Sequence, residues 1–195
     1  MKTILALVII ALPLTGCGSI GAYTESKADT QVSFFEYSAD TDGYINKSTS
    51  LRIAETGLVS GSTLLYATIG SSSLIYDGQQ QYKVVYPLWI NESEIDDVEF
   101  AIEKYRYWQE QVNPEQYSSI MPINEYVSEW MNGITFKFGL FNGKKGKPFM
   151  SVCYEFTEAG RCTFTYMIDG QNIELLSDDL DKFKQHSFGL HKLAG

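Results

Sequence analysis

The sequence predicts an α+β fold: an antiparallel β-sheet, or two, with a long central helix and a second, shorter helix in a single domain. Runs rich in Val, Ile, Tyr, Phe and Thr, separated by Gly, Asn, Asp and Ser, occupy both ends of the chain. Between them, apolar residues recur every three or four positions, which is typical of an amphipathic helix. A hydrophobic content of 44% and an aromatic content of 14% indicate a globular chain with one core.

Strands are expected first, before the long helix. Turn pairs such as Asp42-Gly43 and Asp77-Gly78 separate segments of high β-propensity. The expected strands span residues 32–37, 44–53, 63–69, 73–76 and 82–90. Pro87 lacks an amide hydrogen, so the last of these runs should end there or lie at a sheet edge.

The long helix is expected over residues 91–112. Its apolar stripe consists of Ile95, Val98, Ala101, Ile102, Tyr105, Trp108 and Val112. Acidic residues crowd its first turns, where the helix dipole stabilises carboxylates, and Asn91 or Ser93 can cap it. Asn113-Pro114 should end it. The shorter helix is expected over Ile123–Met131, with Gly133 just beyond its end.

Strands are expected again after this second helix. Loops that contain glycine, such as Asp169-Gly170, separate four further runs of β-branched and aromatic residues. These runs span residues 134–141, 149–156, 162–168 and 171–176. Ser177 can cap a final short helix over Asp178–Gln185.

The first nineteen residues predict export. Lys2 precedes an apolar run from Ile4 to Leu12, which is too short to span a bilayer and is typical of a secretory signal. The signal ends in Leu14-Thr15-Gly16-Cys17. This ending resembles the lipobox of bacterial lipoproteins, a resemblance that covers about nineteen residues.

The lipobox resemblance implies that Cys17 becomes the first mature residue and carries a diacylglycerol thioether and an N-acyl chain such as palmitate. Two or more acyl chains give stable attachment to a bilayer. Gly18 stands where an Asp would signal inner-membrane retention, so the resemblance implies the outer membrane, facing the periplasm. The predicted division is residues 1–16 as signal peptide, 17–30 as flexible tether and 31–195 as one globular α+β domain.

The chain is acidic, with 24 acidic and 15 basic residues and a formal net charge of −9, or −10 once Lys2 leaves with the signal. The excess lies before Met131, since Cys17 to Trp130 holds 17 acidic and 6 basic residues. Such a surface repels phosphate backbones, which excludes nucleic acid as a partner. It also argues against a polybasic grip on anionic lipid.

Cys153 and Cys162 remain once Cys17 is assigned to lipid. They flank a turn near Glu158 on two strands that should pair antiparallel, in a compartment that oxidises thiols. A redox pair usually has Cys-x-x-Cys spacing, and a metal would need more ligands. We therefore expect a structural disulfide between facing residues of a hairpin.

Other motifs have simpler interpretations. The segment 38–45 matches part of an EF-hand loop but lacks its first and last carboxylates, so a hairpin turn is expected. The acidic run 92–103 is expected to begin a solvated helix rather than to bind a cation or a basic partner. Lys144, Lys145 and Lys147 lack the pattern of a phosphate-binding loop.

Catalytic signatures are absent from the sequence. His186 and His191 have no third ligand for a metal, and neither a Gly-x-Ser-x-Gly nor a His-Glu-x-x-His motif occurs. We expect no cofactor, no metal and no enzymatic activity. The expected function is binding of a protein partner at the envelope, with the acidic charge favouring a basic one, as in an inhibitor or immunity-like protein. Two alternatives stay open: a structural or assembly component of an outer-membrane complex, and a cell-envelope hydrolase.

Overall fold

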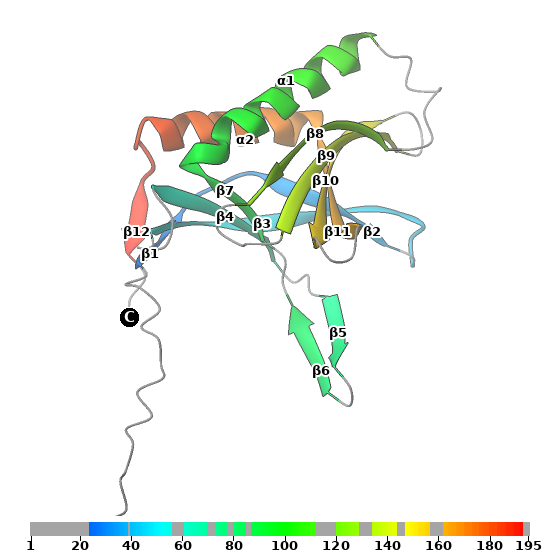
Figure 1. The fold of residues 1–195 in the computed structure, drawn as a ribbon, viewed down its shortest axis with the longest axis horizontal. Helices are drawn as coiled ribbons and strands as arrows, with labels where there is room; N and C mark the ends of the chain where they lie inside the picture. The colour runs from blue at the N-terminus through cyan, green and yellow to red at the C-terminus, as the bar shows by residue number, and fades with distance from the viewer. Residues whose placement is uncertain are drawn as a thin grey trace, which may run out of the picture.

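Two helices lie side by side on one face of a strongly bent antiparallel sheet in the computed structural model of the chain (Figure 1). The predicted α+β architecture is therefore confirmed. The structure describes residues 24–38, 40–55, 61–69, 73–77, 80–84, 87–111, 120–128, 134–143, 147–156 and 162–192. Within these ranges, no helix combines the length and apolar character that crossing a membrane requires.

The elements follow one another as strands, a helix, strands, a helix and a last short strand. The strands are β1 (Thr24–Ala28), β2 (Ser33–Ser38), β3 (Gly43–Glu55), β4 (Ser62–Thr68), β5 (Ser73–Asp77), β6 (Gln80–Val84), β7 (Leu88–Asn91), β8 (Met121–Val127), β9 (Ile134–Asn142), β10 (Pro148–Phe156), β11 (Cys162–Asp169) and β12 (Leu190–Lys192). The helices are the 3₁₀ turn η1 (Glu92–Glu94), α1 (Ile95–Gln111) and α2 (Gly170–Lys184). The expected run 82–90 thus becomes two strands on either side of Pro87.

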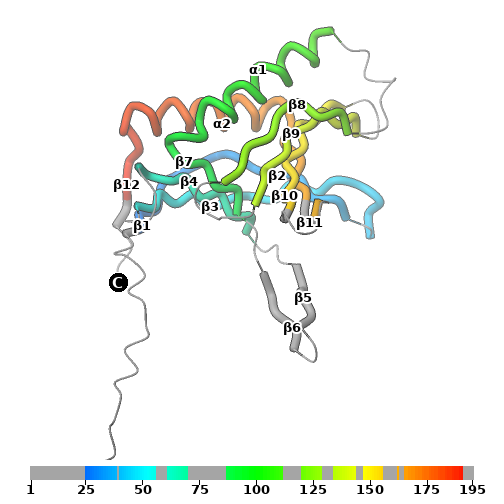
Figure 2. Tube along the Cα trace, in the orientation of Figure 1, coloured from blue at the N-terminus to red at the C-terminus, as the bar shows by residue number. Residues whose placement is uncertain are grey.

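The long strand β3 organises the sheet. Along one edge it pairs with β2 and then with β1, and along the other edge it pairs with β4, which pairs with β7. From β2 the sheet continues through β11, β10 and β9 to β8, while β12 pairs with β1. Figure 2 shows β1 and β12 together at one end of the sheet, so the first and last described segments are neighbours. β5 and β6 pair as a separate hairpin.

The pairing of β1 corrects the predicted tether. Residues 24–28 were expected to be part of a flexible segment, but they pair with Leu51–Glu55 of β3, and Ala28 is buried. Ala28 lies opposite Leu51 and Ser33 opposite Ser48, so four residues of the outer strand oppose two of β3. This bulge bends the strand where β1 passes into β2.

The long helix begins as expected. The Asn91 side chain accepts from the Ser93 amide at 3.1 Å, and the Asn91 amide donates to Glu94 Oε2 at 2.8 Å, which forms a capping box. Val98, Ala101 and Tyr105 of the predicted stripe are fully buried against the sheet. The acidic run 92–103 is thus the start of a capped helix.

The second helix lies elsewhere than predicted. Residues 121–127 form β8, not a helix, because they pair with β9 and Tyr126 stacks on Phe136 at 5.1 Å between ring centroids. The Tyr126 hydroxyl also donates to Trp89 O of β7 at 2.7 Å, which brings the two outer strands of the sheet together. A segment this short has too few turns for its helical spacing to outweigh such tertiary contacts.

Residues 171–176 form the start of α2, not a strand. Asp169 does not form a hairpin turn with Gly170; its Oδ1 accepts from the Asn172 amide at 3.0 Å and caps the helix. The residues that α2 buries recur at three- and four-residue spacing: Ile173, Leu176, Leu180 and Phe183. The short helix expected over 178–185 is the second half of this element.

The core fills the space between the helices and the sheet. Its centre is aromatic: the Phe34 and Tyr166 ring centroids are 5.0 Å apart, and those of Phe136 and Tyr154 are 4.8 Å apart. All four side chains are at most 1% exposed. Because successive residues of a strand point to opposite sides, this packing leaves the other face of the sheet turned away from the helices.

Candidate functional site

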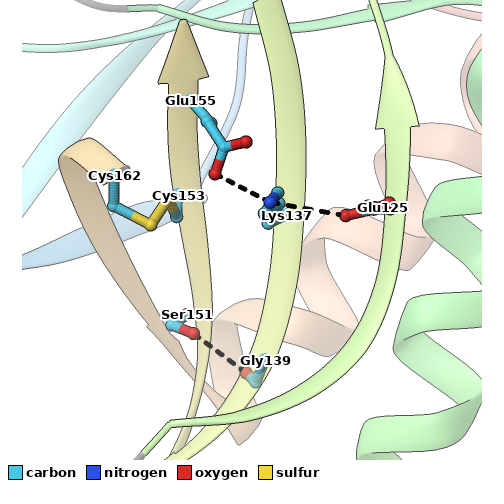
Figure 3. Close-up of a disulfide and its surroundings, with 7 residues drawn as sticks. All are labelled: Glu125, Lys137, Gly139, Ser151, Cys153, Glu155 and Cys162. Atoms are coloured by element: carbon cyan, nitrogen blue, oxygen red, sulfur yellow. Dashed lines mark hydrogen bonds and ion pairs between the residues drawn. A yellow bond between two sulfur atoms is a disulfide. The ribbon is translucent and has the colours of Figure 1, made fainter. Parts of the chain in front are cut away.

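The face of the sheet turned away from the helices carries the predicted disulfide, a charged ladder and an aromatic patch. We call it the open face and define it by alternate residues of the strands from β3 and β2 to β8. It comprises Phe35, Tyr37, Tyr44, Pro122, Glu125, Lys137, Gly139, Phe141, Phe149, Ser151, Cys153, Glu155 and Met167. In Figure 3 the labelled side chains lie on the near side of the strands, with the helices behind.

The predicted disulfide between Cys153 and Cys162 is present, with Cα atoms 5.6 Å apart (Figure 3). A regular hairpin would place the two cysteines directly opposite each other, but here they are offset. Cys153 lies opposite Thr165 and Cys162 opposite Glu155, with a bulge between Tyr154 and Glu155. The bond therefore runs diagonally across β10 and β11 and holds the irregular end of their ladder.

A charged ladder runs beside the disulfide. Lys137 of β9 lies between Glu155 of β10, at 2.7 Å, and Glu125 of β8, at 3.7 Å (Figure 3). The hydrogen bond to Glu155 raises the pKa of Lys137 above its ordinary value. The cation thus links three neighbouring strands, with an acidic residue on each side.

A depression of about 450 Å³ adjoins the disulfide. Ile120, Pro122 and Ile123 border it on one side, and Ser151 and Cys153 on another. Gly139 lies at its floor, where a Cβ would come within 2.9 Å of Ser151 Oγ and would overlap the Ile120 side chain. A glycine is required here because strand β8 and Ile120 approach the β9 backbone closely.

An aromatic patch occupies the part of the open face nearest the β2–β3 hairpin. Its ring centroids are 5.3 Å apart for Phe35 and Phe149, 5.7 Å for Tyr44 and Phe141, and 5.8 Å for Tyr37 and Tyr44. Tyr37 is 58% exposed, whereas Phe149 is 4% exposed, so the patch extends from solvent into the sheet.

Lys147 covers the inner end of the aromatic patch. Its Nζ lies 5.0 Å from the centre of the Phe35 ring and 5.5 Å from that of Phe149, which are cation–π distances. The same Nζ donates to Asp169 Oδ2 at 2.7 Å. Lys147 therefore connects the patch to the start of α2. Lys144 and Lys145 lie outside the described residues.

The turn beside the patch is a hairpin, as expected. Ser38 pairs with Gly43, and the Tyr37 hydroxyl donates to Asp42 Oδ1 at 2.8 Å. Asp42 has a left-handed backbone with φ of 46°, a conformation that Asp and Asn tolerate at turns. This carboxylate is engaged in shaping the turn.

Asp179 is the most buried carboxylate of α2, with its side chain 3% exposed. It accepts hydrogen bonds from Thr30 Oγ1 at 2.6 Å, from Lys182 Nζ at 3.0 Å and from the Tyr66 hydroxyl at 3.2 Å. Burial, together with the Asp179 charge, raises the pKa of Tyr66 well above its ordinary value. This network ties α2 to the bulge between β1 and β2.

Asp169 is the second carboxylate beneath the helices. Burial alone would raise its pKa, but the hydrogen bonds from Lys147 and Asn172 outweigh this effect and lower the pKa below its ordinary value. Asn172 Oδ1 in turn accepts from the Ser33 amide at 2.6 Å. Both carboxylates thus stabilise the position of α2. In the described part of the chain, no group of three or more His, Cys, Asp or Glu residues is placed to hold a metal ion.

The remaining predicted residues lie apart from the open face. His186 follows α2 with φ of 49°, and His191 belongs to β12. Cys17 lies outside the described residues. The sequence interpretation did not find the aromatic patch, although the alternation of Phe35 and Tyr37 along one strand was a signal for two rings on one face.

Comparison with protein-family models, curated proteins and solved structures finds no match to this chain.

Proposed function

We propose that the chain is a lipid-anchored lipoprotein of the bacterial envelope that acts by binding a protein partner and not by catalysis. The predicted lipobox at Cys17 supports the anchor, and the disulfide between Cys153 and Cys162 suits an oxidising compartment. β1 begins at Thr24, so the seven residues from Cys17 span at most about 25 Å. The domain would therefore work close to the bilayer.

The aromatic patch on the open face is the observation that carries the binding function. Tyr37 and Tyr44 present apolar rings with polar tips, a combination that is enriched where proteins contact one another. The buried carboxylates of Asp179 in α2 and of Asp169, which caps α2, are used to position that helix, which is a structural role. The chemistry available on the open face is thus that of a contact surface.

The charge of the chain supports a basic partner. Opposite charge accelerates encounter and suppresses wrong partners, whereas apolar contacts supply most of the affinity. An inhibitor or immunity-like protein that neutralises a basic toxin or lytic enzyme at the envelope would use this combination.

The anchor is tested by metabolic labelling with a fatty-acid probe. The wild-type chain should be labelled and should remain in the membrane fraction. The Cys17→Ser variant should be unlabelled and released by osmotic shock. A wild-type chain without label would contradict the anchor and the proposed compartment.

The contact surface is tested by placing a photo-crosslinking amino acid at Tyr44 in the native cell. We expect a crosslinked product of defined mass. This product should disappear when Tyr37→Ser and Phe141→Ser are introduced into the same chain. Gln171, exposed on α2, provides the matched control position. Equal crosslinking from Gln171, or none from Tyr44, would contradict a binding role for the open face.

A further inference from the structure

The solvent side of α1 carries a regular pattern that the fold does not require. Acidic residues recur every seven positions at Asp96, Glu103 and Glu110, and aromatic residues do so at Phe100 and Tyr107. At 100° per residue, all five lie within about 80° of one another on the helix surface. They form a line of rings beside a line of carboxylates, which we call the α1 stripe.

The rings of the α1 stripe are exposed although they are large and apolar. Phe100 is 44% exposed and Tyr107 is 58% exposed, whereas Val98, Ala101 and Tyr105 of the same helix are fully buried. Exposed aromatic residues at regular spacing on one face indicate a contact surface more than a solvated helix.

The neighbouring helix α2 lies along the side of α1 next to the carboxylates of the α1 stripe, where the charge of Asp96 acts on Lys184 and that of Glu103 on Arg106. Lys184 bonds to Glu99, and Arg106 Nε donates to Glu174 Oε1 at 2.9 Å. These ion pairs connect the two helices along their shared border. Lys104 Nζ lies 5.2 Å from the centre of the Phe100 ring, and the Trp108 ring meets the Tyr107 ring edge-on with centroids 6.4 Å apart.

We infer that the α1 stripe is the docking face for an amphipathic α-helix of a protein partner, with Lys or Arg residues flanking its apolar positions. The seven-residue spacing keeps both rings on one side of the helix across two turns, where a partner helix can contact them together. From Asp96 to Glu110 the stripe extends about 21 Å, which is about four helical turns, or two on either side of a central contact. The rings supply the apolar seam, and the carboxylates beside them pair with the cations of the partner.

Charge complementarity selects this occupant over a second copy of the chain. In a two-fold helix pair, each α1 stripe would place its carboxylates against those of the other copy, and the chain already carries a net charge of −9. A cationic helix removes this repulsion. The aromatic patch lies on the opposite face of the sheet, so occupancy of one surface does not exclude occupancy of the other.

The inference rests on the proposed function in treating the chain as a binding protein with a basic partner, and it names the surface and the partner's chemistry. It is tested with the full chain in detergent and a fluorescent three-heptad peptide that has Leu in its seam and Lys beside it. A peptide of the same sequence with Glu in place of Lys is the control peptide. Fluorescence anisotropy gives the dissociation constant at low and at high salt.

We expect the Lys peptide to bind and to weaken at least tenfold in the Phe100→Ser/Tyr107→Ser variant. Glu103→Gln/Glu110→Gln should weaken binding severalfold at low salt and less at high salt. The matched controls are Ile69→Ser/Leu190→Ser, which removes two exposed apolar residues that belong to neither the aromatic patch nor the α1 stripe, and Asp178→Asn/Asp181→Asn, which removes two exposed carboxylates of α2. Both controls should bind within twofold of the wild type.

The proposal is overturned if the Lys peptide does not bind, or if the Glu peptide binds as tightly as the Lys peptide. It is also overturned if a control variant loses as much affinity as the α1 stripe variant to which it is matched. These outcomes leave the lipid label at Cys17 and the crosslink at Tyr44 unaffected. Failure of the α1 stripe is therefore distinguishable from failure of the proposed function.

Discussion

The two faces of β9 and β10 have opposite chemistry although they come from the same strands. Toward the helices, Phe136, Phe138, Val152 and Tyr154 are at most 1% exposed and belong to one hydrophobic cluster. On the open face, the residues between them are Lys137, Gly139, Cys153 and Glu155. The inner residues are similar to one another, whereas the open-face residues are held by an ion pair between Lys137 and Glu155, by a hydrogen bond to Gly139 O and by the disulfide of Cys153.

This difference shows how the strands combine folding with function. Burial of the inner face is non-directional, so stability depends on size and shape at each position. On the open face the disulfide, the Lys137 ion pairs and the ring contacts are individually directional. We therefore expect substitutions on the inner face to change stability and those at the exposed end of the open face to change binding.

The largest expected effect is that of Phe138→Ala, compared with Phe141→Ala on the same strand. Phe138 is 1% exposed inside the core, and its truncation should lower the unfolding free energy by about 3–5 kcal/mol. Phe141 is half-buried on the open face, and its truncation should cost about 1 kcal/mol while reducing the Tyr44 crosslink. Urea denaturation of both variants measures the difference, and equal losses would contradict the division between the faces.

The next largest loss of stability is expected when Cys153→Ala/Cys162→Ala removes the disulfide. The bond closes a short loop, since its cysteines are nine residues apart in sequence. The chain-entropy model predicts a loss of about 2–3 kcal/mol. Reducing agent should lower the wild-type stability toward that of the variant and leave the variant unchanged. A variant as stable as the oxidised wild type would show that the bulged β10–β11 ladder does not need the bond.

Much of the fold could be predicted from the sequence where a single periodicity extends over many residues. α1 buries apolar residues at helical spacing from Ile95 to Tyr105, over about three turns, and has a capping box, so local pattern and packing agree. Residues 121–127 and 171–176 are short and contain both helix- and strand-compatible residues. Asp169-Gly170 is compatible with a hairpin turn and with a helix start. The helix forms because the Asp169 carboxylate accepts hydrogen bonds from the Asn172 amide and from Lys147 Nζ.

Only the part of the candidate site that is formed by residues close in sequence could be predicted. Cys153 and Cys162 are close in sequence, so their pairing follows from one hairpin. The aromatic patch joins Phe35 with Phe149, which become neighbours only because β2 pairs with β11 in the middle of the sheet. No sequence pattern predicts that pairing, because it depends on how β3 bends and on where α2 begins.

A smaller effect is expected from Gly139→Val at the floor of the depression. Its side chain would overlap Ile120 and crowd Ser151, at a cost of about 1–3 kcal/mol. Gly43→Ala is the matched control, because a Cβ there meets the Thr41 carbonyl oxygen at an ordinary 3.7 Å, and stability should change by about 0.5 kcal/mol or less. Thermal unfolding of both variants tests the close approach of β8 to β9. A tolerated valine would mean that Ile120 moves aside freely.

The smallest effect on stability is expected from substitution of Lys147. This residue contacts the aromatic patch, where it covers two rings, and also the start of α2, where it pairs with Asp169. Lys147→Met keeps the apolar stem and removes the charge, so the loss at pH 7 should be at most about 1 kcal/mol. The pKa of Asp169 is lowered in the folded chain, so this carboxyl contributes stability above its unfolded pKa of about 4. The contribution is lost as the pH falls through the lowered folded-state pKa.

Lys147→Met should therefore differ from the wild type at pH 7, and the two should converge as the pH falls through the lowered pKa of Asp169, below which the carboxyl is protonated in both. Asp169→Asn provides the control, since the pair is already absent there and adding Lys147→Met should change little at any pH. Urea unfolding at a series of pH values measures the gap. If the gap is the same in acid and at pH 7, the ammonium group acts on the Phe35 and Phe149 rings and not through Asp169. Lys147 would then belong to the aromatic patch alone, and its substitution should alter the Tyr44 crosslink without any pH dependence.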